Sequence, residues 1–341
     1  MAAGSALQTI AEGPMATAQL NDSLVVITGA SSGIGRCAAH EFARHGARLV
    51  LAARDAQALA AVVRECEQLG AQALAVPTDV TRNQAMEHLA KQAADFGAGR
   101  IDVWVNNAGV GAVGRFEDTP LAAHEQVVQT DLLGYLRGAY VVLPYFKAQK
   151  SGVLINTLSL GSWVAQPYAA AYSAAKYGLR GLTEALRGEL TPWPNIHVCD
   201  LYPAVMDTPG FRDGGNFTGR ALTPPPPRYD PRLVAEAMIE VVLKPRASKT
   251  VGSTAALLRL AHFLVPGFTQ LSGLIVGRAL KRGQRARPSS GNLFHPPSGE
   301  RRIDGGWREP AGDSQMPRLM TATAVVLLLG WGLLHLRNES R

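Results

Sequence analysis

Short apolar runs alternate with amphipathic stretches through the first half of the chain. The apolar runs are Leu24–Ile27, Arg48–Ala52, Gln72–Val76, Ile101–Val105 and Val153–Thr157, and the amphipathic stretches include Arg36–His45, Gln57–Leu69 and Arg82–Phe96. Such short runs are typical of buried parallel strands, and the stretches between them have the length of crossover helices. The pattern therefore predicts an α/β fold, in which a single doubly wound, Rossmann-like parallel sheet carries helices on both faces.

The pattern changes towards both ends of the chain. Residues 1–22 are small and weakly polar, and they predict a loose leader before a domain that spans residues 23–245. Residues 246–318 form a basic, partly apolar extension and linker. Within it, the apolar stretch Ala255–Leu280 is broken by Pro266 and predicts two short helices, on a membrane or on a neighbouring subunit. The remainder is rich in Arg, Pro, Gly and Ser and predicts an irregular cover.

The last apolar stretch, residues 319–336, contains no formally charged side chain. Its length is at the lower end of a bilayer span, so it predicts a single transmembrane helix, with a buried C-terminal helix as the alternative. More arginines precede this segment than follow it. The positive-inside rule then places the preceding domain on the cytosolic side of the membrane.

Composition and charge narrow the class of protein. The 341 residues suit one large domain with appendages, and 47% hydrophobic against 18% charged residues supports a buried core. Three cysteines argue against a disulfide scaffold. Residues 1–245 carry a net charge of −2 and residues 246–341 a net charge of +9, so the basic excess lies beside the apolar tail. This distribution favours anionic lipid as a partner, whereas no motif indicates nucleic acid or a metal site.

A glycine-rich turn joins the first apolar run to the first amphipathic stretch. Glycines at a strand-to-helix turn let a pyrophosphate approach the helix N-terminus, where free N–H groups favour an anion. An ordinary tight turn is the alternative. The candidate cofactor-binding residues here are Thr28, Gly29, Ser31, Ser32, Gly33, Ile34 and Gly35.

The end of the second apolar run indicates which dinucleotide binds. An acidic residue there would accept from the ribose 2′-hydroxyl of NAD, but this chain has Arg54 beside Ala53. Because a guanidinium suits a phosphate dianion, the sequence predicts NADP (NADPH) as the cofactor, with a solvated surface arginine as the alternative. Asp55 comes one residue too late for the ribose and is expected to cap the next helix.

Three residues form a candidate catalytic set. Tyr172 and Lys176 are four residues apart in a helical stretch, so their side chains share one face. A phenol is a weak acid with a reference pKa of about 10, and a nearby ammonium stabilises its phenolate form. Ser159 follows the run that ends at Thr157, at the edge where open α/β sheets bind ligands, and its hydroxyl could hold a substrate oxygen. Taken alone, the Tyr–Lys pair could equally be a surface pair.

Two further segments are expected at the same edge. Asn106–Gly109 follows the run that ends at Val105, where a tight turn can close over the adenine side of a dinucleotide. Asp79 and Val80 end the preceding strand, and the carboxylate could accept from the adenine amino group. The candidate cofactor-binding residues of this edge are Asp79, Val80, Asn107, Ala108 and Gly109.

The glycine turn, the Asn106–Gly109 turn, Ser159 and Tyr172–Lys176, in this order and spacing, resemble the short-chain dehydrogenase/reductase family over roughly residues 23–242. The spacing of the glycines resembles the compact oxidoreductase branch. This resemblance implies hydride transfer between NAD(P) and a carbonyl or alcohol, with Tyr172 as acid/base and Ser159 as the residue that orients the substrate. It also implies that Lys176 binds the nicotinamide ribose and activates the tyrosine, and that the chain forms homodimers or homotetramers.

Two positions depart from the family pattern. Where the family has Asn in V-N-x-x-G, this chain has Asp131, which can accept from a relay water and stabilise the Lys176 ammonium but cannot donate. Where the family has P-G-x-V-x-T, the chain has Ala204 in place of Gly, although Pro203 and Thr208 remain to meet the nicotinamide carboxamide. Asp131 is therefore counted with the catalytic residues.

The segment that caps the substrate in this family is apolar here. It contains Phe211 and Phe217, and Trp163, Tyr168 and residues 110–116 add further apolar groups. We therefore expect a lipophilic carbonyl or alcohol as substrate, unless these groups only pack on the domain. The alternative function is a catalytically weak NADP-binding sensor or scaffold protein at a membrane, favoured by Asp131 and Ala204.

Overall fold

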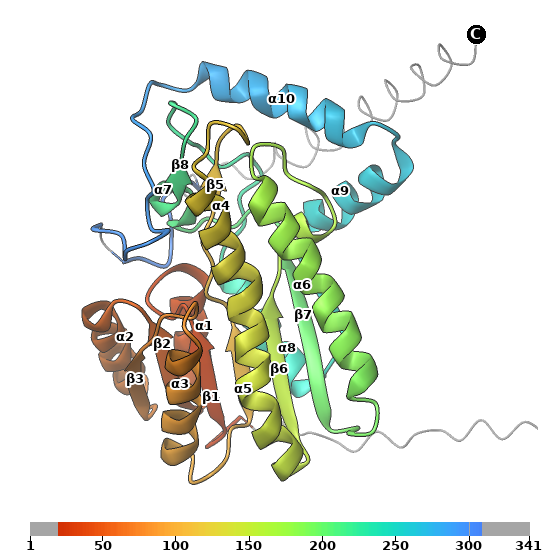
Figure 1. The fold of residues 1–341 in the computed structure, drawn as a ribbon. Coiled ribbons are helices and arrows are strands. Elements are labelled where there is room, and N and C mark those ends of the chain that lie inside the picture. The colour runs from red at the N-terminus through yellow and green to blue at the C-terminus, as the bar shows by residue number, and fades with distance from the viewer. Residues whose placement is uncertain (1–19, 300, 309–341) are drawn as a thin grey trace, which may run out of the picture.

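The computed structural model describes residues 20–299 and 301–308 (Figure 1). The predicted transmembrane segment 319–336 and almost all of the predicted leader 1–22 lie outside these residues. Within the described ranges, no helix is long and apolar enough to span a bilayer.

Seven parallel strands form the main sheet. They are β1 (Leu24–Thr28), β2 (Arg48–Ala53), β3 (Ala73–Pro77), β4 (Val103–Asn106), β6 (Gly152–Thr157), β7 (Ile196–Pro203) and β9 (Ser248–Val251), in the spatial order β3-β2-β1-β4-β6-β7-β9. Val26 of β1 pairs with Val50 on one side and with Trp104 on the other, so β1 is an interior strand. The chain changes direction across the sheet between β1 and β4, which is where open α/β sheets bind their ligands.

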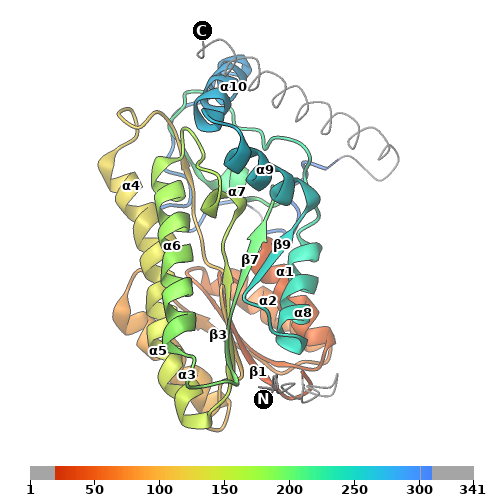
Figure 2. The ribbon, with the colours of Figure 1, turned by 90° about the vertical axis from the view of Figure 1, so that its right-hand side faces the viewer.

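Helices cover both faces of this sheet, as Figure 2 shows from its edge. One face carries α1 (Gly33–Arg44), α2 (Ala56–Gln68) and α8 (Arg232–Leu243), and the other carries α3 (Asn83–Phe96), α5 (Gly134–Gln149) and α6 (Ala170–Glu189). Within β1, Val25 and Ile27 pack on the first layer and Leu24 and Val26 on the second, because side chains alternate along a strand. The predicted doubly wound α/β fold is confirmed.

The sheet extends beyond residue 245, where the sequence analysis ended the domain. Strand β9 pairs with β7 through Asp200–Ser248 to Pro203–Val251 and forms the edge of the sheet. Its four residues, Ser-Lys-Thr-Val, contain no apolar run, and only Val251 is buried. An edge strand needs little apolar surface, so hydrophobic patterning did not reveal it.

The remaining elements gather at the carboxyl ends of the strands. They include α4 (Leu121–Val128), which continues through a π-helical turn (Gln129–Leu133) into α5. They also include a 3₁₀ turn (Leu160–Ser162), α7 (Gly210–Asp213), and a two-stranded sheet of β5 (Ala112–Val113) and β8 (Gly215–Asn216). Helices α9 (Ser253–Leu264) and α10 (Phe268–Arg282) follow β9, with a break around Pro266, in the stretch where the sequence predicts two short helices. The chain then returns over the same edge in an irregular segment, residues 283–299 and 301–308, which we call the strap (Figure 1).

Candidate active site

The turn between β1 and α1 has a backbone that requires glycine. Gly29 and Gly33 have φ angles of +69° and +54°, in the left-handed region that favours glycine. A Cβ on Gly35 would collide with the carbonyl oxygen of Gly29. The helix can therefore begin close to the strand, with its N-terminus directed at the sheet edge.

The N-terminus of α1 offers hydrogen-bond donors to this edge. The N–H of Gly33 donates to the carbonyl oxygen of Arg302 in the strap at 2.8 Å. The N–H groups of Ile34 and Gly35 have no acceptor among the described residues. Two free donors at a helix N-terminus fit a phosphate, so the residues present here suit a dinucleotide.

A cleft along this edge collects most of the predicted cofactor residues. It is lined by Gly29, Ser31, Ser32, Gly33, Ile34, Arg54, Asp79, Val80, Asn107, Ala108, Gly109 and Thr208. Thr28 does not line it. Its buried hydroxyl accepts from the N–H groups of Asn107 (2.9 Å) and Ala108 (3.2 Å) and so joins the ends of β1 and β4. Gly35 also lies behind the cleft, as part of the close contact with Gly29.

The strap contacts the residues at the end of β2. Arg54 donates to the carbonyl oxygens of Asn292 (2.6 Å) and Leu293 (3.1 Å). Burial lowers the pKa of Arg54, and nearby Arg301 lowers it further, whereas Asp79 opposes the shift. Asp55 accepts from the N–H of Ala58 at 3.0 Å, which confirms the predicted helix cap.

A second cleft adjoins the first and holds the predicted catalytic residues. Ser159, Tyr172, Lys176, Asp131 and Pro203 all line it. The Ser159 hydroxyl accepts from the N–H of Gly161 at 3.0 Å, at the start of the 3₁₀ turn. A Cβ placed on Gly161 would lie 3.2 Å from Cε1 of Tyr172 and 3.4 Å from Oγ of Ser159. The tyrosine ring and the serine hydroxyl therefore flank the same small volume.

Lys176 is the centre of a buried cluster beneath Tyr172. Its Nζ lies 3.3 Å from Oδ2 of Asp131, 3.2 Å from the carbonyl oxygen of Thr157 and 3.5 Å from the hydroxyl of Tyr135. Burial opposes the charged form, but Tyr135, Asp131 and Tyr172 outweigh it and raise the pKa of Lys176. Burial raises the pKa of the Tyr135 hydroxyl to about 12, because it disfavours the phenolate. The amine is therefore a cation at neutral pH.

Asp131 connects this cluster to the cofactor cleft. It lies in the π-helical turn between α4 and α5, and its Oδ1 accepts from the N–H of Val110 at 2.8 Å. Burial raises the pKa of Asp131, while Lys176 and the Val110 N–H counteract the shift. The carboxylate thus fixes both the lysine and the loop that follows Asn107.

The second cleft has an apolar wall. Its apolar lining residues include Val110, Val113, Leu158, Leu160, Val205, Met206, Phe211 and Leu222. Trp163 and Phe217 lie outside this lining. Trp163 is stacked between the guanidinium groups of Arg180 and Arg259, and Phe217 packs against the buried Leu293 of the strap. Part of the expected apolar surface therefore packs within the protein.

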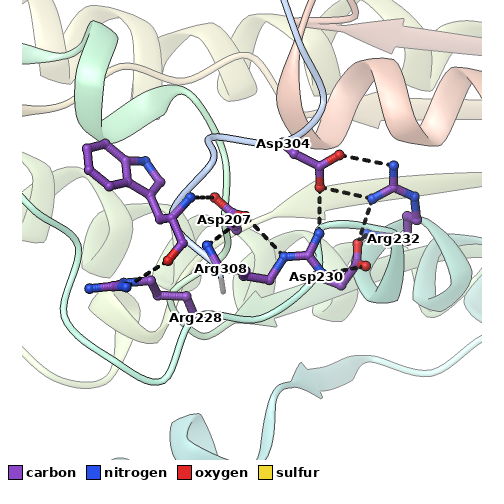
Figure 3. A network of polar contacts seen from close by, with 7 residues as sticks. Asp207, Arg228, Asp230, Arg232, Asp304 and Arg308 are labelled. Atoms are coloured by element: carbon purple, nitrogen blue, oxygen red, sulfur yellow. Dashed lines mark hydrogen bonds and ion pairs between the residues drawn. The ribbon is translucent and has the colours of Figure 1, made fainter. Parts of the chain in front are cut away.

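Sequence reasoning missed the role of Asp207, one residue before Thr208. This buried carboxylate accepts from the N–H groups of Trp307 (2.9 Å) and Arg308 (3.2 Å) and from Nε of Arg308 (3.0 Å). The Arg308 guanidinium also pairs with Asp230 (2.6 Å) and Asp304 (2.6 Å), as Figure 3 shows. The only sequence signal was the excess of arginine after residue 280, which does not identify partners about 80 to 100 positions away.

Comparison with known proteins places this arrangement in a family. The short chain dehydrogenase family matches residues 23–215. A 3-dehydrosphinganine reductase from Danio rerio is 34% identical over 200 residues, which span 57% of this chain and 60% of that enzyme. The chain thus matches less than two thirds of this relative's length.

Solved structures resemble the chain over most of their own length. An alcohol dehydrogenase from Thermococcus sibiricus complexed with 5-hydroxy-NADP has a TM-score of 0.59 and 27% identity, and the match covers 69% of this chain and 98% of that one. A short chain dehydrogenase/reductase from Burkholderia phymatum in complex with NAD has a TM-score of 0.64 and 25% identity, with 79% and 99% covered. The chain described here belongs to the short-chain dehydrogenase/reductase family of oxidoreductases.

Proposed function

We propose that this protein transfers a hydride between NADP(H) and a lipophilic carbonyl or alcohol, with Tyr172 as the acid/base. The observation that carries this proposal is the position of Tyr172 and Ser159 around one small volume, directly above a buried lysine. The nicotinamide supplies or accepts the hydride when it is bound. The residues of the chain then have to position the substrate and move one proton.

Each catalytic side chain has a separate task in this proposal. In the reductive direction, the Tyr172 hydroxyl donates its proton to the carbonyl oxygen, and Ser159 holds that oxygen by a hydrogen bond. The phenolate that forms is stabilised by the cation of Lys176, whose Nζ lies 5.6 Å from the centre of the Tyr172 ring. The product is an alcohol, and the reverse reaction uses the same groups.

The preference for NADP(H) over NAD(H) is argued from Arg54. This arginine lines the first cleft at the end of β2, and no described carboxylate lies within ion-pair distance of it. Asp79 acts on this half-buried cation electrostatically but forms no ion pair with it, so a ligand that brings a phosphate dianion can pair with it directly. One of the solved structures contains 5-hydroxy-NADP and another contains NAD, so the preference rests on this residue.

The apolar wall of the second cleft supports a lipophilic substrate. The Danio rerio relative is named for a reaction on 3-dehydrosphinganine, so long-chain ketones are the first substrates to test. NADPH oxidation can be measured by its absorbance with a series of ketones. We expect kcat/KM to increase as the alkyl chain of the ketone becomes longer.

The substrate proposal has a matched pair of variants. Phe211→Ala removes a lining side chain and should reduce kcat/KM for long ketones but not for short ones. Phe116→Ala removes an exposed ring outside the cleft and should change neither. A wild-type kcat/KM that is independent of chain length would contradict the lipophilic substrate.

We also propose that the protein is a single-pass membrane protein through residues 319–336, with its catalytic domain on the cytosolic side. Helices α9 and α10 support this proposal because they expose Leu260, Phe263, Leu264, Leu274 and Ile275, and the side chain of Phe263 is 85% exposed. Basic residues accompany these apolar ones, including Arg278 and Lys281. A lipophilic substrate dissolved in a bilayer would then lie near the second cleft.

Membrane fractionation tests the anchor. The full chain should remain in the membrane pellet after alkaline carbonate extraction. Protease added to intact cells should leave the catalytic domain uncut, whereas protease added to the cytosolic face of isolated membranes should cleave it. Recovery in the carbonate supernatant would contradict the anchor and leave the proposed chemistry unaffected.

A homodimer or homotetramer is proposed from exposed side chains on α5 and α6. Leu136, Tyr140 and Tyr177 are large, apolar or aromatic, and exposed there. Light scattering in detergent should give a mass of two or four chains, and Tyr140→Asp should reduce that mass. A monomeric wild type would contradict this assembly.

A further inference from the structure

We propose that the strap forms one wall of the cofactor site and that its Arg301 binds the 2′-phosphate of NADP(H) together with Arg54. This inference rests on the proposed NADP(H) dependence and adds a specificity residue from a segment outside the family match, which ends at residue 215. The strap is thereby a part of the active site rather than a linker.

The strap lies along the cofactor cleft. Asn292, Pro296, Pro297 and Arg301 line the same cleft as the glycine turn and Arg54. The carbonyl oxygen of Arg302 accepts from the N–H of Gly33, but the next two N–H groups of α1 have no acceptor in the part of the chain that the structure describes. The strap therefore borders the anion-binding helix end without filling it.

Two guanidinium groups converge at the adenosine end of this cleft. Arg301 is only 13% exposed in its side chain and pairs with Oδ2 of Asp55 at 2.7 Å. Arg54 is oriented by two strap carbonyl oxygens, and the repulsion from Arg301 contributes to its lowered pKa after burial. Asp55 pairs with Arg301, and Asp79 acts on Arg54 without forming an ion pair with it. A phosphate dianion between the two guanidinium groups could pair with both of them, whereas a ribose hydroxyl carries no charge to do so.

The strap is held firmly enough to define a wall. Beyond Arg301, the Arg308 guanidinium joins Asp207, Asp230 and Asp304, as Figure 3 shows. Before Arg301, the side chain of Leu293 is completely buried against Val110, Val127 and neighbouring residues. Because the strap is anchored on both sides, Arg301 is presented to the cleft in a fixed position.

Cofactor affinity of the full chain in detergent tests this inference without turnover. Dissociation constants for NADPH and NADH are measured by nicotinamide fluorescence on the wild type and on Arg301→Ala. We expect Arg301→Ala to weaken NADPH binding by about 10- to 100-fold and NADH binding by less than about twofold, because only NADPH carries the 2′-phosphate. Arg301→Lys keeps the charge and should retain most of the preference.

Two further variants separate a ligand role from a structural one. Asp55→Asn preserves the helix cap and removes the partner of Arg301. If Arg301 acts on the phosphate, this variant should bind NADPH as tightly as the wild type or more tightly. If Arg301 acts only by pairing with Asp55, this variant should reproduce Arg301→Ala. Arg287→Ala, at an exposed strap position, is the control and should change neither constant.

The possible failures are distinguishable. A wild-type preference for NADPH that survives Arg301→Ala, or an equal loss for both cofactors, would overturn the inference and leave the proposed function standing. A wild type that binds NADPH no more tightly than NADH would overturn both the inference and the proposed cofactor preference.

Discussion

Two clusters of charged side chains lie at the carboxyl edge of the sheet, and they are built differently. The catalytic cluster comprises Asp131, Tyr135 and Lys176, and the side chains of its ion pair are 1% and 4% exposed. The strap anchor comprises Asp207, Asp230, Asp304, Arg232 and Arg308. In the strap anchor, Arg308 is 31% exposed and only Asp207 is fully buried.

The difference indicates different roles. In the catalytic cluster one cation and one carboxylate interact without solvent screening, so the protonation state of each depends strongly on the other. In the strap anchor several half-exposed pairs share partners, and solvent screening leaves the protonation of each less dependent on any single neighbour. The first arrangement suits proton transfer, and the second suits holding a segment in place.

Removing the cation of the catalytic cluster should have the largest effect. In Lys176→Met, Asp131 is left buried without a counter-charge, which should lower the free energy of unfolding by about 3–5 kcal/mol. Turnover should fall by about 10²- to 10⁴-fold because the Tyr172 phenolate loses its stabilising charge. Thermal unfolding and initial rates measure the two effects. Lys91→Met, at an exposed position of α3, is the control, and equal behaviour of both variants would disprove the distinct role of Lys176.

Breaking the strap anchor should affect stability more than chemistry. Arg308→Ala removes the cation that contacts Asp207, Asp230 and Asp304, and it should lower the free energy of unfolding by about 2–3 kcal/mol. Denaturant unfolding measures the change, with Arg287→Ala expected within about 0.5 kcal/mol of the wild type. If kcat at saturating cofactor fell as far as in Lys176→Met, the two clusters would not differ in role.

Changing the carboxylate of the catalytic cluster should change the pH dependence. Asp131→Asn keeps an acceptor for the Val110 N–H but removes the negative charge that helps to raise the pKa of Lys176. The pKa of Lys176 should therefore fall, and the alkaline limb of the kcat profile should move to lower pH. An unchanged profile between pH 7 and the alkaline limit would show that Asp131 does not tune the lysine.

Acid should weaken the contacts that hold the strap, and we expect this change to be the smallest of those predicted here. Arg232 and Arg308 lower the pKa of Asp304, and contacts with both arginines outweigh burial and lower the pKa of Asp230. Carboxylates with a lowered folded pKa contribute stability that is present above the unfolded value of about 3.9 and is lost as the pH falls through the folded value. Pepsin cleavage within the strap should therefore increase as the pH falls below about 4. Cleavage that did not depend on pH in this range would contradict the anchor.

The same contrast explains what the sequence could predict. Strands β1 to β4 and β6 came from short apolar runs, and the candidate catalytic residues came from motifs at their ends, because both depend on neighbours in sequence. Edge strand β9 did not, because its four residues contain no apolar run. The strap did not, because it is held by pairs such as Arg308–Asp207, which lie 101 positions apart. A segment rich in Arg, Pro and Gly has no periodicity that could indicate such partners.

The proposed roles differ in how directly they follow from local sequence. The contact of Asp131 with Lys176 at 3.3 Å agrees with the expectation that this carboxylate stabilises the ammonium. Its second contact, with the Val110 N–H, depends on the π-helical turn, which no sequence signal indicated. Thr28 is a second case in which contacts distant in sequence decide the role. The sequence predicts it at the cofactor, whereas its hydroxyl joins the ends of β1 and β4.

The central claim, that Tyr172 is the acid/base of an NADP(H)-dependent oxidoreductase, is tested most directly by Tyr172→Phe. Steady-state reduction of a long-chain ketone and NADPH binding by fluorescence are measured on the same preparation. We expect turnover to fall by about 10²- to 10⁴-fold while the NADPH dissociation constant stays within about twofold of the wild type. A Phe variant with wild-type turnover would contradict it.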